Sequence, residues 1–336
     1  MPEAAQTLGS VFITGASAGI GAATARLLAS EGYIVYAAVH TGAGALAGLP
    51  GVRQVPVDVT DPGTVAAAAR QVAAQAGDRG LHAVINNAGI IVQGPLELIP
   101  PADLLRQFRV NTLGPAYVVQ AFLPLLRAGH GRVINISAPT ARLPMPFMAP
   151  ISASKAALAS LSDALRLELA AWGIPVCVVE PGATDTQIFA KAQTAADAGL
   201  ASADPGRVAL YADQLAAMGR VAARQRLSPV EPAARAVLTA VRARRPRRRY
   251  TAGNDARVLG ILAHLPASQR DRLISAVIGL GKIKAPARDQ AWPVSKRLIF
   301  PPVIVKAHRV RMSPQVSFRN AAIRDRPPSA ADSTSI

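Results

Sequence analysis

A glycine-rich segment near the N-terminus restricts the fold more than any other feature of this 336-residue chain. It runs from Thr14 to Gly21, directly after a short apolar run at 10–14 and before a helical pattern over 20–31. Glycines keep such a turn tight and let a pyrophosphate approach the backbone, where the N-terminus of the helix offers free N–H groups and a partial positive charge. This strand–turn–helix context predicts a dinucleotide-binding site, with a purely structural turn as the alternative.

Short apolar strands alternate with helices over the first 180 residues. We predict strands at 10–14, 34–39, 54–57, 83–86, 132–137 and 175–180, and helices at 20–31, 64–76, 101–126 (one helix or two) and 152–172. This alternation is typical of βαβ units around a buried parallel sheet. Right-handed crossovers then favour a doubly wound α/β fold.

The pattern changes after residue 182. We expect a mostly helical stretch over 186–226, a helix at 231–245, a short strand at 249–252, and one or two apolar helices over 257–280. One domain is therefore predicted over 8–280, with a helical lid at about 187–226. Residues 281–336 are basic and have little periodicity, which predicts a disordered tail.

Further motifs follow the glycine turn in a characteristic order: Asp58 after the third strand, Asn86-Asn87-Ala88-Gly89 at the end of the fourth, Asn111 in a helix, and Pro181-Gly182 with Thr184 and Thr186 after the sixth. With the Thr-Gly-x-x-x-Gly-x-Gly turn, they resemble the classical short-chain dehydrogenase/reductase family over about residues 8–280. The resemblance implies a Rossmann-type doubly wound sheet and NADP or NAD as the cofactor.

The resemblance assigns cofactor contacts to residues near the carboxyl ends of the strands: Thr14, Gly15, Ser17, Gly19, Ile20, Gly21, His40, Asp58, Val59, Asn87, Ala88, Gly89, Lys155, Pro181, Gly182, Thr184 and Thr186. After the second strand, NAD-type relatives often carry an acidic residue and NADP-type relatives an arginine. This chain has His40 there, which favours NADP when protonated. A simple surface-turn role for His40 is the alternative.

The catalytic pattern of the family is incomplete in this chain. Relatives use a tyrosine four residues before a lysine, a serine thirteen residues before that tyrosine, and a helix asparagine. Lys155 and Asn111 match, whereas Ile151 and Ala138 occupy the tyrosine and serine positions. Because residues 151 and 155 share one face of a helix, the register is kept and only the hydroxyl is missing. The resemblance therefore implies a carbonyl/alcohol oxidoreductase with weak or no classical activity.

Neighbouring groups are poor replacements for the missing hydroxyls. On a strand, Ser137 would point away from the face that carries position 138, and Ser152 lies about 100° round the helix from Ile151. A serine without an activating partner is also a weak acid or base. Lys155 acting through a water is the best substitute, although isoleucine fills much of that space.

Three functions stay open. The first is a slow oxidoreductase for a hydrophobic substrate, since the lid is apolar and alanine-rich. The second is a catalytically silent nucleotide-binding sensor. The third is a structural partner of active relatives, joined as a homo-oligomer or with related subunits through helices 102–126 and 152–172.

The net charge of +17 belongs mostly to the C-terminal third. Residues 1–230 hold 16 basic and 14 acidic residues, whereas residues 231–336 hold 21 and 6. The basic cluster Arg242–Arg249 is interpreted as a solvated turn, with contact to nucleic acid or an anionic membrane as the less favoured alternative.

The sequence also gives expectations about the cellular compartment, disulfides and metal sites. No apolar run reaches the roughly 18 residues that span a bilayer, and no leader segment is predicted. The single cysteine, Cys177, lies in an apolar run and is expected to be a buried small hydrophobe. A cytoplasmic protein without disulfides or a metal site is therefore expected.

Overall fold

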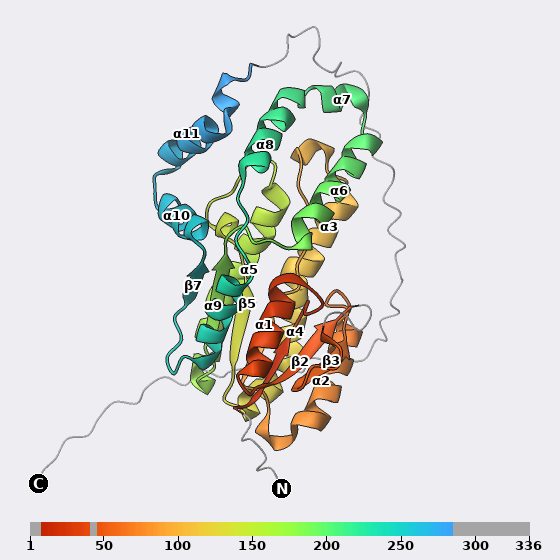
Figure 1. Ribbon diagram of the computed structural model, residues 1–336, viewed down its shortest axis with the longest axis vertical. Coiled ribbons are helices and arrows are strands. Elements are labelled where there is room, and N and C mark those ends of the chain that lie inside the picture. The colour runs from red at the N-terminus through yellow and green to blue at the C-terminus, as the bar shows by residue number, and fades with distance from the viewer. Residues whose placement is uncertain (1–7, 41–45, 285–336) are drawn as a thin grey trace, which may run out of the picture. The chain divides into compact units, whose positions relative to one another are not determined.

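The computed structural model describes residues 8–40 and 46–284, so the predicted tail lies almost wholly outside the described residues (Figure 1). A seven-stranded sheet forms the centre, in the order β3-β2-β1-β4-β5-β6-β7, and every pair of neighbours is parallel. The strands are β1 (Ser10–Ile13), β2 (Ile34–Val39), β3 (Val52–Pro56), β4 (Ala83–Asn86), β5 (Arg132–Ile136), β6 (Val176–Pro181) and β7 (Arg249–Ala252). The predicted doubly wound, Rossmann-type fold is confirmed.

Helices cover both faces of the sheet and extend beyond the carboxyl ends of its strands (Figure 1). They are α1 (Gly19–Ser30), α2 (Pro62–Ala76), α3 (Pro101–Phe108), α4 (Gly114–Ala128), α5 (Ala149–Glu168), α6 (Gln187–Ser202), α7 (Pro205–Ala209), α8 (Ala212–Arg224), α9 (Glu231–Arg242), α10 (Asn254–Leu262) and α11 (Ala267–Ile278). None of these helices is both long and apolar enough to cross a bilayer, within the part of the chain that the structure describes.

Two hydrophobic clusters hold the layers together, one on each face of the sheet. Val11 and Ile13 of β1 pack with α1 and α9, whereas Phe12 between them packs with α2 and α4. This alternation follows from the two-residue period of a strand that is buried on both sides. Cys177 of β6 belongs to the α1/α9 cluster with 1% of its surface exposed, and burial raises the pKa of its thiol to about 11.

The stretch predicted as one helix or two over 101–126 is divided by a π-helical turn at Arg109–Leu113. Pro115 has no N–H to donate to the carbonyl one turn earlier, so the regular helical ladder is interrupted there. Next to it, a Cβ at Gly114 would lie 3.0 Å from Cγ2 of Val59. The interruption matters because Asn111 lies within this turn.

Candidate functional site

The turn after β1 requires glycine at three positions. Gly15 and Gly19 have φ values of 64° and 56°, in the left-handed region that glycine adopts readily. A Cβ at Gly21 would lie 2.2 Å from the carbonyl oxygen of Gly15, because α1 starts directly against the turn. Ser17 is exposed at the tip and Ile20 is partly buried. The turn therefore has the tight path and accessible backbone that a pyrophosphate needs.

The N-terminus of α1 has the donors that an anion requires. Its N-cap residue, Ala18, supplies no side-chain oxygen, and no acidic residue stands in the first turn. The N–H groups and positive dipole end therefore stay available for a ligand. An open hollow of about 380 Å³ adjoins them, lined by Ala18, Gly19, Ala23, Arg26, Asp185, Thr186, Gln187 and Val230. These features fit a dinucleotide pyrophosphate.

Thr14 and Asn87 join the glycine turn to the end of β4. The Thr14 hydroxyl accepts the N–H groups of Asn87 and Ala88, each at 3.0 Å. The Asn87 amide donates in return to the carbonyl oxygens of Thr14 at 2.9 Å and Gly15 at 3.0 Å. The turn and the segment 87–89 thus lie side by side between β1 and β4, where the strand order reverses. Ligands of doubly wound sheets bind in the crevice at such a reversal.

Asn111 and Lys155 both face Gly89. A Cβ at Gly89 would lie 3.4 Å from Oδ1 of Asn111 and 3.7 Å from Nζ of Lys155. The amine donates to the carbonyl of Ile136 at 2.7 Å, and the Asn111 side chain accepts from and donates to the backbone of Ile90 at 2.9 and 3.0 Å. Burial lowers the pKa of Lys155 to about 8. The structure therefore brings together the two catalytic positions that match the family pattern.

Gln107 fixes this part of the site, although no motif marks it. It is fully buried, accepts the N–H of Val92 at 2.7 Å, and donates to the Ser154 hydroxyl at 3.1 Å and the carbonyl of Ile90 at 3.0 Å. Its hydrogen bonds connect α3 to α5 and to the segment 90–92, which contains Ile90, the backbone partner of Asn111. Its place four residues before Asn111, on the same helical face, is the one signal that could have revealed it.

The two positions that depart from the family pattern lie beside these groups. Ile151 is 5% exposed and stands one helical turn before Lys155 on α5, and Ala138 follows β5. Neither side chain carries a proton to transfer. The Ser137 hydroxyl lies 3.5 Å from the backbone carbonyl of Lys155, and the buried hydroxyl of Ser152 has no hydrogen-bond partner among the described residues. The register is therefore kept and the hydroxyls are replaced by hydrocarbon.

His40 and Asp58 form a pair at the carboxyl ends of β2 and β3. Nε2 of His40 lies 3.5 Å from Oδ2 of Asp58. The other oxygen of Asp58 accepts the N–H and the hydroxyl of Thr60, both at 2.8 Å, and the backbone bond is the main cause that lowers the pKa of Asp58. Val59 is buried against Gly114. The predicted adenosine-side residues thus lie at the same sheet edge as the glycine turn.

The segment after β6 closes over the glycine turn. The methyl group of Thr186 would lie 2.9 Å from a Cβ at Gly19, so these two segments are in contact. Thr184 is buried and its hydroxyl donates to the carbonyl of Gly182 at 2.9 Å. Asp255 of α10 fills the space that a side chain at Gly182 would need, and accepts the next backbone N–H at 2.7 Å. Helix α10 therefore supports this side of the site.

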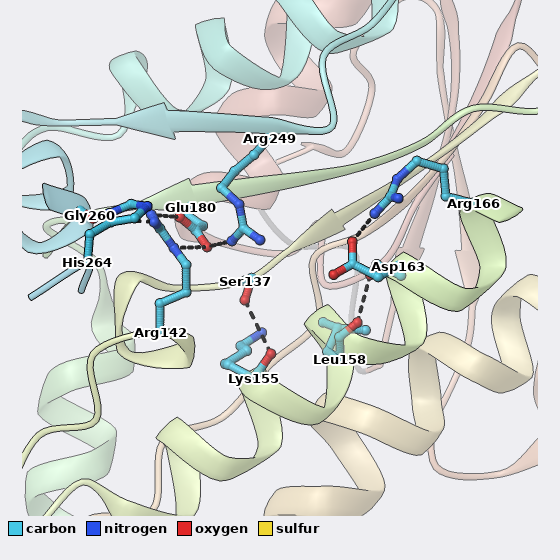
Figure 2. Close-up of polar contacts among 11 residues, drawn as sticks. Ser137, Arg142, Lys155, Leu158, Asp163, Arg166, Glu180, Arg249, Gly260 and His264 are labelled. Atoms are coloured by element: carbon cyan, nitrogen blue, oxygen red, sulfur yellow. Dashed lines mark hydrogen bonds and ion pairs between the residues drawn. The ribbon is translucent and has the colours of Figure 1, made fainter. Parts of the chain in front are cut away.

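A buried ion cluster links β6 and β7 to the segment after β5 (Figure 2). Glu180 of β6 is fully buried, and Nη2 of Arg142 lies 2.6 Å from one of its oxygens, while Arg249 of β7 binds the other. Arg142 also donates to the carbonyl of Gly260 in α10 at 3.4 Å. No sequence pattern marks this cluster, because Arg142 and Arg249 lie 38 and 69 residues from Glu180.

Helix α7 and the residue before α8, in the segment predicted as a lid, contact the connection between β4 and α3. Tyr211, next to α8, donates to Oε2 of Glu97 at 2.8 Å, and Nε of Arg207 in α7 donates to Oε1 at 3.1 Å. The hydrogen bond from Tyr211 is the main cause that lowers the pKa of Glu97. The Tyr211 ring also meets Phe147 edge-on at 6.4 Å. These contacts hold α7 and the start of α8 against the segments around Glu97 and Phe147.

Burial of Lys155 predicts a gain in stability at alkaline pH. Its pKa is about 8 in the folded protein against an ordinary 10.5, so between these values the unfolded chain holds a proton that the folded chain has released. Stability should then rise across this window, by an amount of order 3 kcal/mol, and fall again as the pH drops through 8. Urea unfolding over this pH range measures it.

The matched variants for that measurement are Lys155→Met and Lys191→Met. Lys155→Met should flatten the alkaline rise in the free energy of unfolding. Lys191 is exposed on α6, so Lys191→Met should leave that rise unchanged. Equal slopes for the Lys155→Met variant and the unsubstituted protein would contradict the burial argument.

The fold and the site define a dinucleotide-binding α/β protein, and comparison with known proteins names its family. The model of the short chain dehydrogenase family matches residues 10–197. Retinol dehydrogenase 5 of Homo sapiens is 34% identical over 281 residues, which cover 80% of this chain and 88% of that protein. This chain therefore belongs to the short chain dehydrogenase family of oxidoreductases.

Other relatives match over a smaller share of their length. A 3-amino-tetrahydro-pyrrolizinone reductase of Xenorhabdus hominickii is 35% identical over 182 residues, which span 54% of this chain and 64% of the reductase. The match to estradiol 17-beta-dehydrogenase 2 of Rattus norvegicus, at 35% identity, covers 53% of this chain and 49% of that protein.

A solved structure agrees with the fold and contains a cofactor. The short chain dehydrogenase of Burkholderia cenocepacia J2315 in complex with NADP superposes with a TM-score of 0.63 and 26% identity, over 81% of this chain and 98% of that one. Family membership and this neighbour support binding of a nicotinamide cofactor.

Proposed function

We propose that this protein binds a nicotinamide dinucleotide, NADP in preference to NAD, and transfers hydride between a carbonyl and an alcohol only slowly or not at all. The observation that carries the proposal is the contrast at α5: Lys155 lies beside Gly89 and Asn111, while Ile151 one turn earlier is buried hydrocarbon. General acid–base groups contribute roughly 10² to 10⁴-fold to such reactions. Loss of two of them leaves mainly binding and orientation.

The residues of the site would have the following roles in cofactor binding. The glycine turn and the N-terminus of α1 would hold the pyrophosphate, and Lys155 would hold the ribose hydroxyls. Thr184 and Thr186 would close over the nicotinamide. When bound, the nicotinamide supplies or accepts the hydride, and Asn111 would keep its bond to the backbone at 90 during turnover. No proton donor stands where Ile151 is.

A cofactor titration paired with a turnover assay tests the proposal. Quenching of intrinsic fluorescence by NADPH and NADH should give saturable binding, while a panel of ketones and alcohols should give turnover far below the typical 10 s⁻¹ or so of enzymes. Turnover at an ordinary rate would contradict the proposal that the catalytic site is degenerate. If neither cofactor binds, the proposal of a nucleotide-binding protein is wrong.

His40 is expected to decide the cofactor preference. Its imidazole stands at the end of β2 beside Asp58, and 69% of its side chain is exposed, so a 2′-phosphate could approach it from solvent. His40→Arg should tighten NADPH binding by roughly tenfold, because a guanidinium is always charged and can bind a phosphate through two N–H groups. His40→Asp should shift the preference to NADH. An unchanged ratio of the two dissociation constants in both variants would contradict this role.

The substrate side supports a hydrophobic molecule as the substrate. Helix α6 and the residues around the start of α3 meet at a pocket of only about 30 Å³, lined mostly by apolar side chains such as Leu98, Ile99 and Leu200 but also by Gln93, Asp103 and Arg106. A panel of apolar ketones is therefore the first choice for the turnover assay.

A silent sensor or a structural partner is the alternative function. Exposed Leu105, Leu113, Leu161, Leu167 and Trp172 on or next to α3, α4 and α5 favour association with a second subunit through these helices. Cofactor binding without turnover selects the sensor. Absence of both, together with co-purification of a related dehydrogenase subunit, selects the structural partner.

A further inference from the structure

The helices α10 and α11 carry an unusual concentration of exposed apolar side chains. Val258 and Ile261 on α10 are 55% and 70% exposed, and Leu273 and Val277 on α11 are 46% and 77% exposed. The members of each pair are three or four residues apart, so each pair occupies one helix face. On the opposite side of α10, Ala256 and Gly260 are buried, and on α11 Ile278 is buried. Each helix therefore has an inner packed face and an outer apolar face.

Cations flank these apolar side chains. Arg257, Arg272, Lys282 and Lys284 are all exposed within or just after the two helices. The stretch 254–284 has two acidic residues, and both are engaged: Asp255 accepts the N–H of Ala183, and Asp271 lies 3.7 Å from Arg270. The outer surface is thus apolar and positively charged at the same time.

Apolar side chains among cations favour one kind of binding partner for this outer face over two others. A second copy of the same face would bring like charges together across a two-fold interface, which is unfavourable. A nucleic acid would meet the cations but leave the apolar side chains uncovered, and the stretch 254–284 has no phenylalanine, tyrosine or tryptophan on which a base could stack. An anionic bilayer matches both, because its headgroups neutralise the cations and its acyl boundary accepts the aliphatic side chains.

The outer faces of α10 and α11 lie near the helices of the predicted lid. Figure 1 shows α10 and α11 beyond the carboxyl ends of the strands, at the same end of the molecule as α7 and α8, and α11 contacts α8. A bilayer on their outer face would lie next to the lid. We propose that the outer face of α10 and α11 is a peripheral docking surface for anionic lipid bilayers.

Vesicle binding by the full-length protein tests this surface independently of cofactor binding. At low ionic strength, the protein should co-sediment with vesicles of phosphatidylcholine and phosphatidylglycerol, and weakly or not at all with phosphatidylcholine alone. Ile261→Ser with Val277→Ser should weaken binding by roughly tenfold or more, because the exposed aliphatic groups supply the insertion. Arg257→Gln with Arg272→Gln should weaken it and reduce its salt dependence.

A site-specific label keeps the test decisive if those variants unfold. Ile261→Cys offers a thiol for a polarity-sensitive fluorophore, since the native Cys177 is buried. Its emission should shift to the blue on addition of anionic vesicles. The same label at Leu167→Cys, a position 75% exposed on α5, should not shift.

Three results would overturn the proposal. They are absence of binding to anionic vesicles at low salt, a blue shift at position 167 equal to that at 261, and vesicle binding that the two aliphatic substitutions leave unchanged in folded protein. Preferential binding to duplex DNA with no effect of the aliphatic substitutions would assign the cations to a nucleic acid instead.

Discussion

Ile151→Tyr combined with Ala138→Ser is expected to raise carbonyl reduction by a factor on the order of 10² to 10⁴. Position 151 lies one turn before Lys155 on α5, so a tyrosine introduced there shares a helix face with an amine whose pKa burial has lowered to about 8. A cation at that place lowers the pKa of a neighbouring phenol. Ala138→Ser restores a donor to the substrate oxygen. Steady-state reduction of apolar ketones with NADPH measures the gain.

Ile151→Phe with Ala138→Ser is the matched control for that experiment. Phenylalanine supplies the ring without the hydroxyl, so any rate it adds comes from packing alone. The tyrosine variant should also show a pH dependence of kcat/KM that the phenylalanine variant lacks. Equal rates in the two variants, or an ordinary rate in the unsubstituted protein, would show that the hydroxyl at 151 is not what limits this site.

Glu180→Ala should destabilise the fold by about 3 kcal/mol. Removal of one partner of a buried ion pair costs about 3–5 kcal/mol, since the remaining charge is left without a counterion. The lower end applies here, because the side chains of Arg142 and Arg249 keep 25% and 31% exposure and can reach water. A fall in the thermal midpoint of roughly 6 to 12 °C corresponds to this loss.

Two comparisons separate the buried cluster from a general effect of lost charge. Glu168→Ala removes an exposed carboxylate from α5 and should change the midpoint by about 1 °C or less. Glu180→Gln keeps the volume and one acceptor, so its loss should be smaller than that of Glu180→Ala. If Glu180→Ala and Glu168→Ala have the same midpoint, the cluster contributes nothing measurable to stability.

Sequence patterns predicted the parts of the fold that depend on neighbouring residues. The bounds of β2, β4 and β7 were predicted exactly, since short apolar runs between turn residues leave little choice. The bounds of α5 were less accurate: it begins at Ala149, three residues before the predicted start, because Pro150 is tolerated in a first helical turn. The interruption at Arg109–Leu113 lies directly before Gly114 and Pro115, and the pattern over 101–126 left one helix or two open.

The site divides in the same way. The glycine turn, the relation of Ile151 to Lys155 and the segment 182–186 could be placed from spacing and family resemblance. The contacts of Gln107, Glu180 and Glu97 could not, because their partners come from distant parts of the chain. A side chain's partner across the fold follows from how helices pack on the sheet, which a local pattern does not contain.

The sequence by itself determined a dinucleotide turn between a strand and a helix, and the absence of a hydroxyl at 151 and 138, because both are properties of neighbouring residues. Only the tertiary structure decided that the Lys155 amine is buried beside Gly89 and Asn111, and that α10 and α11 expose apolar side chains among cations. Burial sets the pKa of the amine and the exposure of those helices, and burial is a property of the assembled chain.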